Sequence, residues 1–350
     1  TNQFQNETFK SFSAGANSNI TLFNGLANWK TLQRTKLNKI ANSYRLDKMK
    51  DDIALSVANS YLQILFNKEQ LKVQKNQNLV TKENIKRTQE LIEAGTLPAG
   101  DIYELQATDA TQQQQIISTE NALLISKIAL CQTLLLEEYA TFDISDEIID
   151  LPMSNVTNET QAAILTKAKE SVKDVKIAMS NVDIAKKDVS ISRSSYLPTL
   201  SGFFGYNTRW AESTPFNFAD QLSLFDGTAI GLQLNVPILN GFATRGRVQR
   251  AKINQERSEF QLKQAELDLE RNVYQAYNDV INAKKSFEAA QKTLEARKQS
   301  FNFSKERFDV GLMNSFDFSQ ASFAYENAQS DVLRTKYDYI FRTKILEFYF

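Results

Sequence analysis

Side chains that usually catalyse reactions or bind metals are scarce in this chain. It carries 41 basic and 41 acidic residues, but it has no histidine and only one cysteine, Cys131. Histidine is the common general base, zinc ligand and pH switch, so its absence removes the simplest catalytic and metal sites. Cys131 lies in the apolar run 128–131, which predicts a packed core residue rather than a reactive thiol.

Pairs of carboxylates are the remaining candidates for acid and base chemistry. Glu137 and Glu138 form such a pair, but adjacent acids in a charged helical sequence more often form a solvated helix face. The sequence contains no glycine-rich phosphate loop, no serine, histidine and aspartate set, and no cluster of metal ligands. We therefore expect no enzymatic activity, no cofactor and no metal site.

The charge balance and the hydropathy exclude two further classes of protein. A net charge of zero, with both signs mixed along the chain, argues against a nucleic-acid-binding surface, which needs a basic face. No apolar segment approaches the roughly 18–20 residues that a membrane-spanning helix requires. A part of this protein that crosses a membrane would therefore have to be built from strands.

An internal repeat organises the chain, with Gly25 of the first half corresponding to Gly241 of the second. Residues 20–27 (ITLFNGLA) return as residues 236–243 (VPILNGFA), and residues 93–101 return as residues 309–317. The register is kept without a gap between these motifs. It predicts a duplicated half-protein, which is a common origin of internal pseudo-symmetry in transport proteins.

Two very long helices are predicted at 26–93 and 243–310. Both segments lack proline, are poor in glycine and are rich in alanine, glutamine, lysine and glutamate. Apolar residues from Leu262 to Leu294 recur at a mean spacing of about 3.6 residues, the helical period. Each helix would be ~100 Å long. Helices of this length cannot fold around a compact core, so we expect them to run as coiled-coil-like pairs.

Each long helix ends at a glycine turn that is followed by an aspartate. Gly95 is expected to end the first helix, with Asp101 as the cap of a returning helix. Gly311 and Asp317 repeat this arrangement after the second long helix. Two helical hairpins follow from this pattern.

Three other segments complete the helical pattern. The returning helices are predicted at 102–139 and 318–348, and a further helix at 160–192 opens the second half of the chain. Residues 142–158, which include Pro152, are predicted to form an irregular connector between the halves.

Three segments alternate with a period of two and are predicted to be strands: 12–22, 200–210 and 228–239. Their even-numbered positions are mostly apolar and their odd-numbered positions mostly polar. Their lengths match a tilted strand that crosses a membrane. The edge of a soluble sandwich alternates in the same way, but a sandwich has no need of helices this long, so we favour membrane strands.

The order of these elements, given twice, resembles that of the TolC family of outer-membrane efflux proteins. Residues 194–200 (SSYLPTL) resemble the family's junction from helix to strand, and residues 236–241 (VPILNG) its junction from strand to helix. Residues 308–312 (FDVGL) resemble the hairpin tip that members present to periplasmic adaptor proteins. The likeness covers nearly the whole chain.

The resemblance implies a mixed α and membrane-β fold. The expected assembly is a homotrimer with a twelve-stranded β-barrel, to which each chain gives up to four strands, continued by an α-helical barrel of coiled-coil hairpins. Open sheet edges are not tolerated in hydrocarbon, so closing the barrel needs several chains. Even-numbered side chains would then face lipid and odd-numbered ones a wet lumen, with Tyr206 and Trp210 in an interfacial aromatic belt.

The implied function is a passive exit duct in the outer membrane of a Gram-negative bacterium, extending into the periplasm. Its partners would be a periplasmic adaptor, an inner-membrane pump reached through that adaptor, and outer-membrane lipid. The machine would be a tripartite efflux or type I secretion system. The alternative is a structural coiled-coil protein of the surface or a scaffold, without a pore. Strands of lipid-crossing length distinguish the two, since a filament has no use for them.

The expected segments follow the chain in six parts. They are a barrel strand of the first repeat at 1–25, a helical hairpin at 26–140, a connector at 141–159, a helix at 160–195, a pair of barrel strands at 196–241, and the second hairpin at 242–350. The resemblance also implies a helix and a strand ahead of residue 1.

Two groups of site residues are expected at the ends of the elements. The adaptor-docking tips are Gly95, Thr96, Leu97, Val310, Gly311 and Leu312. The strand–helix junctions are Asn24, Gly25, Pro198, Pro237, Asn240 and Gly241. A proline is tolerated at a strand end because its missing N–H is not needed there.

The aperture of the duct is the third expected site. The family's two acidic positions fall on Asp317 and Gln320, so one carboxylate remains. A tyrosine and an arginine that help to hold some members shut correspond to Phe308 and Met313, which cannot make the same polar link. The closed state would therefore depend on packing and on Asp317.

Overall fold

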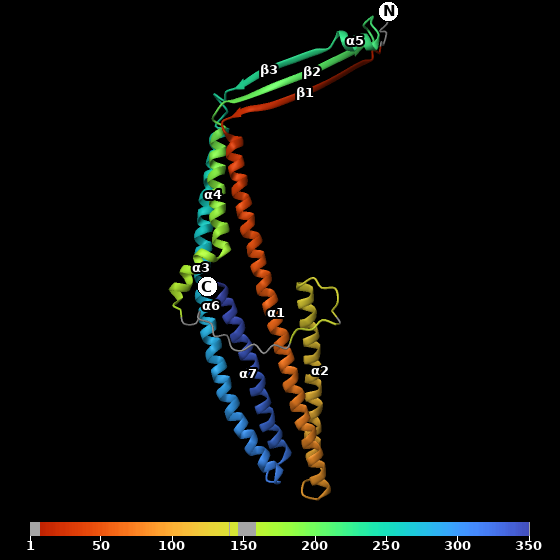
Figure 1. Cartoon of the computed structure of the whole chain (residues 1–350), viewed down its shortest axis with the longest axis vertical. Helices are drawn as coiled ribbons and strands as arrows, with labels where there is room; N and C mark the ends of the chain where they lie inside the picture. The colour runs from red at the N-terminus through yellow and green to blue at the C-terminus, as the bar shows by residue number, and fades with distance from the viewer. Residues whose placement is uncertain (1–7, 140, 146–158, 350) are drawn as a thin grey trace, which may run out of the picture. The chain divides into compact units, whose positions relative to one another are not determined.

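The computed structural model describes residues 8–139, 141–145 and 159–349 (Figure 1). Most of the connector expected at 141–159 lies outside these residues, as do residues 1–7, 140 and 350. The chain divides into two compact units. The first comprises residues 1–44 and 176–264, and the second comprises residues 45–175 and 265–350.

The first unit contains an antiparallel sheet of three strands in the order β1-β2-β3 (Figure 1). They are β1 (Ser11–Asn24), β2 (Thr199–Ala211) and β3 (Gly227–Asn235), and they correspond to the three predicted strands. β3 ends at Asn235, so the prediction that it reaches 239 was wrong. Pro237 explains the early end, because it has no N–H for the ladder and restricts the residue before it.

Over most of their length the three strands pair even-numbered residues with even-numbered residues; beyond a register shift between Thr21 and Phe23, Phe23 of β1 lies opposite Leu200 of β2. Phe204 lies opposite both Ser18 of β1 and Ile230 of β3, and Gly202 lies opposite Leu232. Directly opposite residues share a face of the sheet. The apolar positions of the three strands therefore form one continuous face, as the alternation predicts.

A short helix in the connection between β2 and β3 was not predicted. This helix, α5 (Phe218–Leu224), is fixed by the fully buried Gln221. The Gln221 side-chain carbonyl accepts a hydrogen bond of 2.9 Å from the Ala211 amide. Its Nε2 donates to the carbonyls of Ala211, Thr214 and Phe216. One glutamine thus satisfies several backbone groups of a tight turn that would otherwise lack partners.

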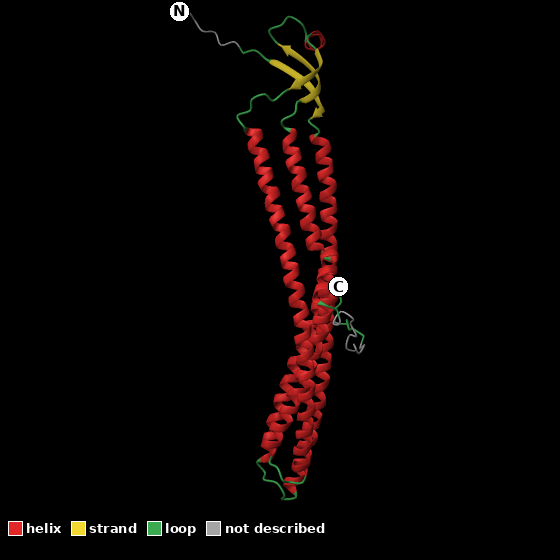
Figure 2. Cartoon of the chain, turned by 90° about the vertical axis from the view of Figure 1, so that its left-hand side faces the viewer, coloured by secondary structure: helices red, strands yellow, loops and turns green. Residues whose placement is uncertain are grey.

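The two long helices are α1 (Ala27–Glu93) and α6 (Ala243–Asp309), each of 67 residues. They return as α2 (Asp101–Thr133) and α7 (Ser315–Tyr349), which makes the two hairpins labelled in Figure 1. Figure 2 shows helices in red and the strands of the sheet in yellow. Among the described residues, no helix is both long and apolar enough to cross a membrane.

α2 ends at Thr133, although the sequence predicts a helix to 139. Leu135 takes a left-handed conformation with φ 55°, and its N–H donates to Gln132 O at 3.2 Å. A leucine seldom adopts this conformation, so no glycine signal marks the end of this helix.

The single helix predicted at 160–192 is two helices, α3 (Gln161–Ser171) and α4 (Lys173–Ser194). Val172 separates them with an extended backbone, φ −67° and ψ 128°. Its β-branched side chain is stiff and suits an extended backbone, and it is buried at the break. A valine within a helical pattern carries no stop signal, so the break was not predictable from the sequence.

Polar as well as apolar side chains hold the helices of the second unit together. Leu62 and Leu65 of α1 form a buried cluster with Tyr337 and Ile340 of α7. The prediction for Cys131 is confirmed, since its free thiol is fully buried. The buried polar residues are bridged in part by side-chain hydrogen bonds between helices, which join Asn67 to Ser126, Asn78 to Asp109 and Gln112 to Glu326.

Candidate functional site

The two faces of the sheet differ sharply in polarity. Ile230 is 83% exposed and Leu232 is 70% exposed, although both are aliphatic and lie on the even-numbered face. The odd-numbered face carries amides and hydroxyls, among them Asn17, Asn19, Ser201, Asn207 and Gln233. A sheet with one bare apolar face and one polar face suits a boundary between lipid and water.

An aromatic cluster covers one end of this sheet. The Phe218 ring of α5 lies 5.6 Å from the Phe12 ring and 5.7 Å from the Trp210 ring, between ring centroids. Trp210 stands where the sequence predicts an interfacial belt, and Tyr206 lies four residues earlier on the same face. Phe218 was missed by the sequence analysis because α5 was missed.

The strand–helix junctions contain two successive left-handed residues each. After β1 these are Gly25 (φ 64°) and Leu26 (φ 65°). After β3 they are Gly241 (φ 57°) and Phe242 (φ 61°), at the corresponding positions of the repeat. A bulky residue with positive φ is uncommon and costs on the order of 1–2 kcal/mol. The glycines were predicted, and the strained residue after each one was not.

Asparagine side chains secure the helix that follows each junction. The Asn24 Oδ1 accepts a hydrogen bond of 3.2 Å from the Asn28 amide, which caps the start of α1. The Asn240 Nδ2 donates to the Thr244 hydroxyl at 2.6 Å, at the start of α6. The predicted junction asparagines therefore hold equivalent turns by different hydrogen bonds.

The two junction glycines differ in their surroundings. A Cβ atom on Gly25 would lie 2.6 Å from Ser194 O and 2.8 Å from Leu197 Cβ, whereas a Cβ atom on Gly241 would meet nothing within 4 Å. Pro198 stands directly before β2, as predicted for a strand end, and Pro237 stands two residues beyond β3. Gly25 is thus packed against the turn that leads into β2.

Both hairpin tips begin with the same backbone turn. Gly95 and Gly311 each have φ 74°, and the amide of each donates to the carbonyl three residues earlier. The next amide, of Thr96 or Leu312, donates to the carbonyl five residues earlier. This is the Schellman pattern of helix ends, which favours glycine at the left-handed position.

The tips expose apolar side chains beside these glycines. At the second tip Val310 is 69% exposed and Leu312 is 70% exposed. At the first tip Leu97 is half-buried, while Thr96 is exposed and its hydroxyl donates to Leu91 O at 2.8 Å. The second tip is therefore the more apolar of the two.

The capping roles expected for the two tip aspartates need correction. Asp101 is the first residue of α2, and the residue before it, Gly100, makes no side-chain cap. At the second tip the cap is Asn314, whose Oδ1 accepts from the Asp317 amide at 2.7 Å. Asn314 Nδ2 also donates to Asp317 Oδ2 at 3.0 Å. Asp317 thus lies in the first turn of α7, where a negative charge is favoured by the helix dipole.

The aperture residues divide into a pair that packs in an apolar cluster and a pair that is exposed. Phe308 is 1% exposed, and its ring stacks on that of Phe318 at 4.5 Å in a cluster that includes Leu105 of α2. Met313 packs against this cluster, whereas Asp317 and Gln320 are both exposed on α7. The structure brings Phe308 and Met313 together but leaves the two polar residues at the surface.

An ion pair near the tips also joins the two hairpins. Arg87 of α1 lies with Nε 3.5 Å from Asp309 Oδ1 at the end of α6. Neither residue was singled out from the sequence, because the pairing depends on how the hairpins pack. The hairpins are therefore linked here by the contact of Leu105 with the Phe308 cluster and by one partly exposed ion pair.

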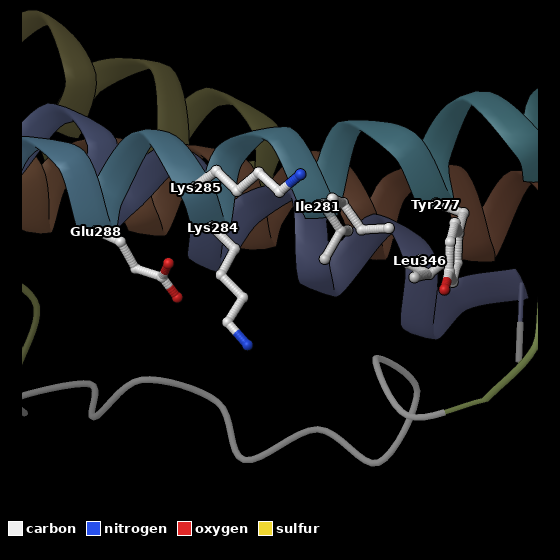
Figure 3. Close-up of a pocket in the computed structure, with 7 residues that line it drawn as sticks. Tyr277, Ile281, Lys284, Lys285, Glu288 and Leu346 are labelled. Carbon is white, nitrogen blue, oxygen red and sulfur yellow. The ribbon is translucent and has the colours of Figure 1, made fainter.

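A cavity of about 280 Å³ lies along α6 and α7 (Figure 3). Its lining includes Ile281, Lys284, Glu288 and Leu346, and Figure 3 shows Lys284 and Glu288 extending to the same side, away from the helix. These polar groups do not converge on one point, as a ligand site requires. Within the described part of the chain, no group of acidic and thiol side chains is placed to hold a metal ion.

Comparison with known proteins adds independent findings. The family described as "Outer membrane efflux protein" matches residues 1–134 and 164–343. The "Outer membrane protein TolC" of Vibrio cholerae is 23% identical over 331 residues, which is 94% of this chain and 74% of that protein. The "Proteases secretion protein PrtF" of Dickeya chrysanthemi is 25% identical over 69% of this chain, which spans half of its length.

The fold is also that of a solved structure from this group. The CmeC outer membrane channel of Campylobacter jejuni superposes with a TM-score of 0.75 over 98% of this chain and 77% of that chain, at 15% identity. At this identity the likeness shows the fold alone. The family match covers most of the chain and includes both hairpins and the sheet. This chain belongs to the outer membrane efflux protein family.

Proposed function

We propose that this chain is one subunit of a passive exit duct that crosses the outer membrane of a Gram-negative bacterium and extends into the periplasm. The observation that carries the proposal is the register of the sheet. It places the aliphatic residues of three strands on one face, where Ile230, Leu232 and Leu234 are 63–83% exposed. Exposure of so large an apolar face to water would be costly, so lipid is its natural surrounding.

Closure of the sheet into a barrel requires further copies of the chain. Each edge strand of a sheet has unpaired backbone N–H and C=O groups, and hydrocarbon offers them no hydrogen-bond partners. β1 and β3 are the two outer strands of the described sheet. We propose a homotrimer with a twelve-stranded barrel, continued by the paired helices as a helical barrel. The matching backbone turns at the two tips and at the two junctions support two equivalent hairpins in each subunit.

The hairpin tips are the proposed docking surface for a periplasmic adaptor. Val310 and Leu312 expose apolar groups on either side of Gly311, and such groups at the end of a helical rod suggest a contact surface. Through the adaptor the duct would meet an inner-membrane pump. The relatives support efflux or type I secretion as the setting, since one of them is named for protease secretion.

The aperture would be held by packing and by one ring of charge. Phe308 and Phe318 form the stacked core beneath the second tip, and Asp317 supplies the exposed carboxylate of each subunit. In a trimer three such carboxylates would converge and attract cations. The Arg87–Asp309 pair would add a polar link between the hairpins.

Arginine substitution on adjacent residues of β3 tests the assignment of the two faces. Leu232→Arg should cost about 2–4 kcal/mol if the residue lies near the middle of the bilayer, and should reduce the amount of assembled protein in outer membranes. Gln233→Arg places the same charge on the polar face and should leave assembly unchanged. Equal loss of assembled protein in both variants would contradict the proposed lipid face.

A further inference from the structure

Along the described strands, the polar face of the sheet carries one large aromatic side chain, that of Phe203; Phe23, beyond the register shift in β1, lies opposite Leu200 of the apolar face. This residue lies at an odd-numbered position of β2, opposite Asn19 of β1 and Gly231 of β3. Its neighbours on the same strand and face are Ser201 and Gly205. The alternation alone predicts a polar residue at this position, so the ring is an exception that the proposed lipid contact does not explain.

A glycine on the neighbouring strand makes room for this ring. A Cβ atom on Gly231 would lie 2.8 Å from Phe203 Cζ and 2.9 Å from Phe203 Cε1. The ring therefore lies over the backbone of β3, in the space that any other residue would fill. This cross-strand pairing of an aromatic ring with a glycine fixes the position of the ring.

The ring remains accessible from the polar side of the sheet. Phe203 is 40% exposed, although its edge is held against Gly231. Amide side chains stand nearby, with Asn19 directly opposite and Gln233 two residues from Gly231 on the same face. A fixed aromatic surface with hydrogen-bonding groups around it can stack a flat ring and bind polar substituents at its edge.

We propose that Phe203 forms a stacking site on the lumen wall of the duct, where it retards solutes that carry a flat aromatic group. The inference rests on the proposed function, because it needs the odd-numbered face to line the lumen. It goes further in naming the residue that discriminates among solutes and the chemical class that it prefers. In a trimer the site would occur three times at one level of the barrel.

Block of single-channel current by two matched cations tests this proposal. The purified full chain is reconstituted in planar bilayers and exposed to benzyltrimethylammonium or to n-butyltrimethylammonium, which have the same charge and similar size but differ in the aromatic ring. The parent channel should be blocked more strongly by the benzyl cation, by about two- to tenfold. Phe203→Leu keeps an apolar side chain and should abolish this difference.

Two further variants separate stacking from a purely structural role. Phe204→Leu makes the same change on the apolar face, where the residue lies opposite Ile230, and should leave the discrimination intact. In Gly231→Ala the new Cβ atom would collide with the Phe203 ring and should displace it from the β3 backbone towards the lumen. The conductance should fall as a result.

The outcomes distinguish failure of the inference from failure of the proposed function. If the parent forms channels and Phe203→Leu retains the preference for the benzyl cation, the proposed stacking site is wrong, whereas the proposed function as a duct is unaffected. If Phe204→Leu rather than Phe203→Leu abolishes the preference, the two faces are exchanged. If the parent forms no channel at all, the proposed function fails and the stacking site with it.

Discussion

Asp317 is held at the start of α7 by hydrogen bonds with Asn314, yet its side chain remains exposed. Asp317→Asn removes the charge and keeps oxygen and nitrogen atoms that can bond to Asn314. If the carboxylate rings the aperture, this variant should weaken cation preference and alter conductance in planar-bilayer recordings, because converging carboxylates concentrate cations. Gln320→Ala, which changes the neighbouring exposed position without a charge, should have little effect.

A role in stabilising the first turn of α7 alone predicts a different result for Asp317. Loss of a favourable charge at a helix N-terminus costs about 0.3–1 kcal/mol and would lower stability slightly. In that case Asp317→Asn would shift the thermal unfolding midpoint while conductance and ion selectivity stayed at the parent values. That result would show that Asp317 has no role at the aperture.

Asp143 provides a pH-dependent contact in the second unit. Its hydrogen bond with Lys68, at 2.8 Å, and the nearby Lys127 lower the pKa of the carboxyl group from 3.8 to about 2. Because the folded state favours the ionised carboxylate, this contact stabilises the fold at pH values above the ordinary pKa. The stabilisation is lost as the pH falls from about 4 to about 2. The effect should be small, since the side chain is half exposed.

Hydrogen–deuterium exchange measures this contact. Asp143→Asn should increase exchange in residues 141–145 at pH 5, because the anchor to Lys68 and Lys127 is weakened. At pH 1, below the pKa of about 2, the parent is largely protonated at this position, so the two proteins should exchange alike. A difference that persists unchanged at pH 1 would show that the charge of Asp143 is not its cause.

At the scale of elements, the two strand–helix junctions form a matched pair with unequal tolerance. Gly25→Ala and Gly241→Ala both place alanine in the left-handed region, at a cost of about 1 kcal/mol each. Only Gly25 also faces Ser194 O and Leu197, so its alanine variant must displace the turn before β2. We expect Gly25→Ala to lower the thermal unfolding midpoint clearly more than Gly241→Ala. Equal midpoints would mean that the turn before β2 can shift at little cost in the free energy of unfolding.

Elements with strong periodic patterns were predicted well from the sequence, and those set by distant contacts were not. α1 and α6 were predicted from long segments almost free of helix breakers, and the left-handed turns that end these helices were predicted from Gly95 and Gly311. The ends and breaks at Leu135 and Val172 were missed because neither residue type signals a helix stop.

The candidate site shows the same division between local and distant causes. The tip glycines and junction asparagines act on backbone groups a few residues away, so the sequence reveals them. Three other contacts join different elements: the stack of Phe308 on Phe318, the Arg87–Asp309 ion pair, and the packing of Phe203 on Gly231. Such pairs depend on tertiary packing, which no local pattern encodes.

At the scale of the whole molecule, the sheet favours an assembly of several chains over a single one. Its apolar face is exposed, and β1 and β3 each have one neighbour among the described strands. We expect the full-length protein, extracted from outer membranes with detergent, to have the mass of a trimer by light scattering or native mass spectrometry. A stable monomer that stays in solution without detergent would exclude the barrel.

The pairing of β1 with β2 also constrains how the protein matures. Ser11 lies opposite Ala211, so more than half of the chain separates two residues that meet in the sheet. Joining ends so far apart in sequence is slow, whereas helical hairpins form from local contacts. β1 must therefore wait unpaired while the first hairpin and α4 are synthesised and exported. During that time it is an aggregation hazard, which gives a holding chaperone a reason to bind this strand first.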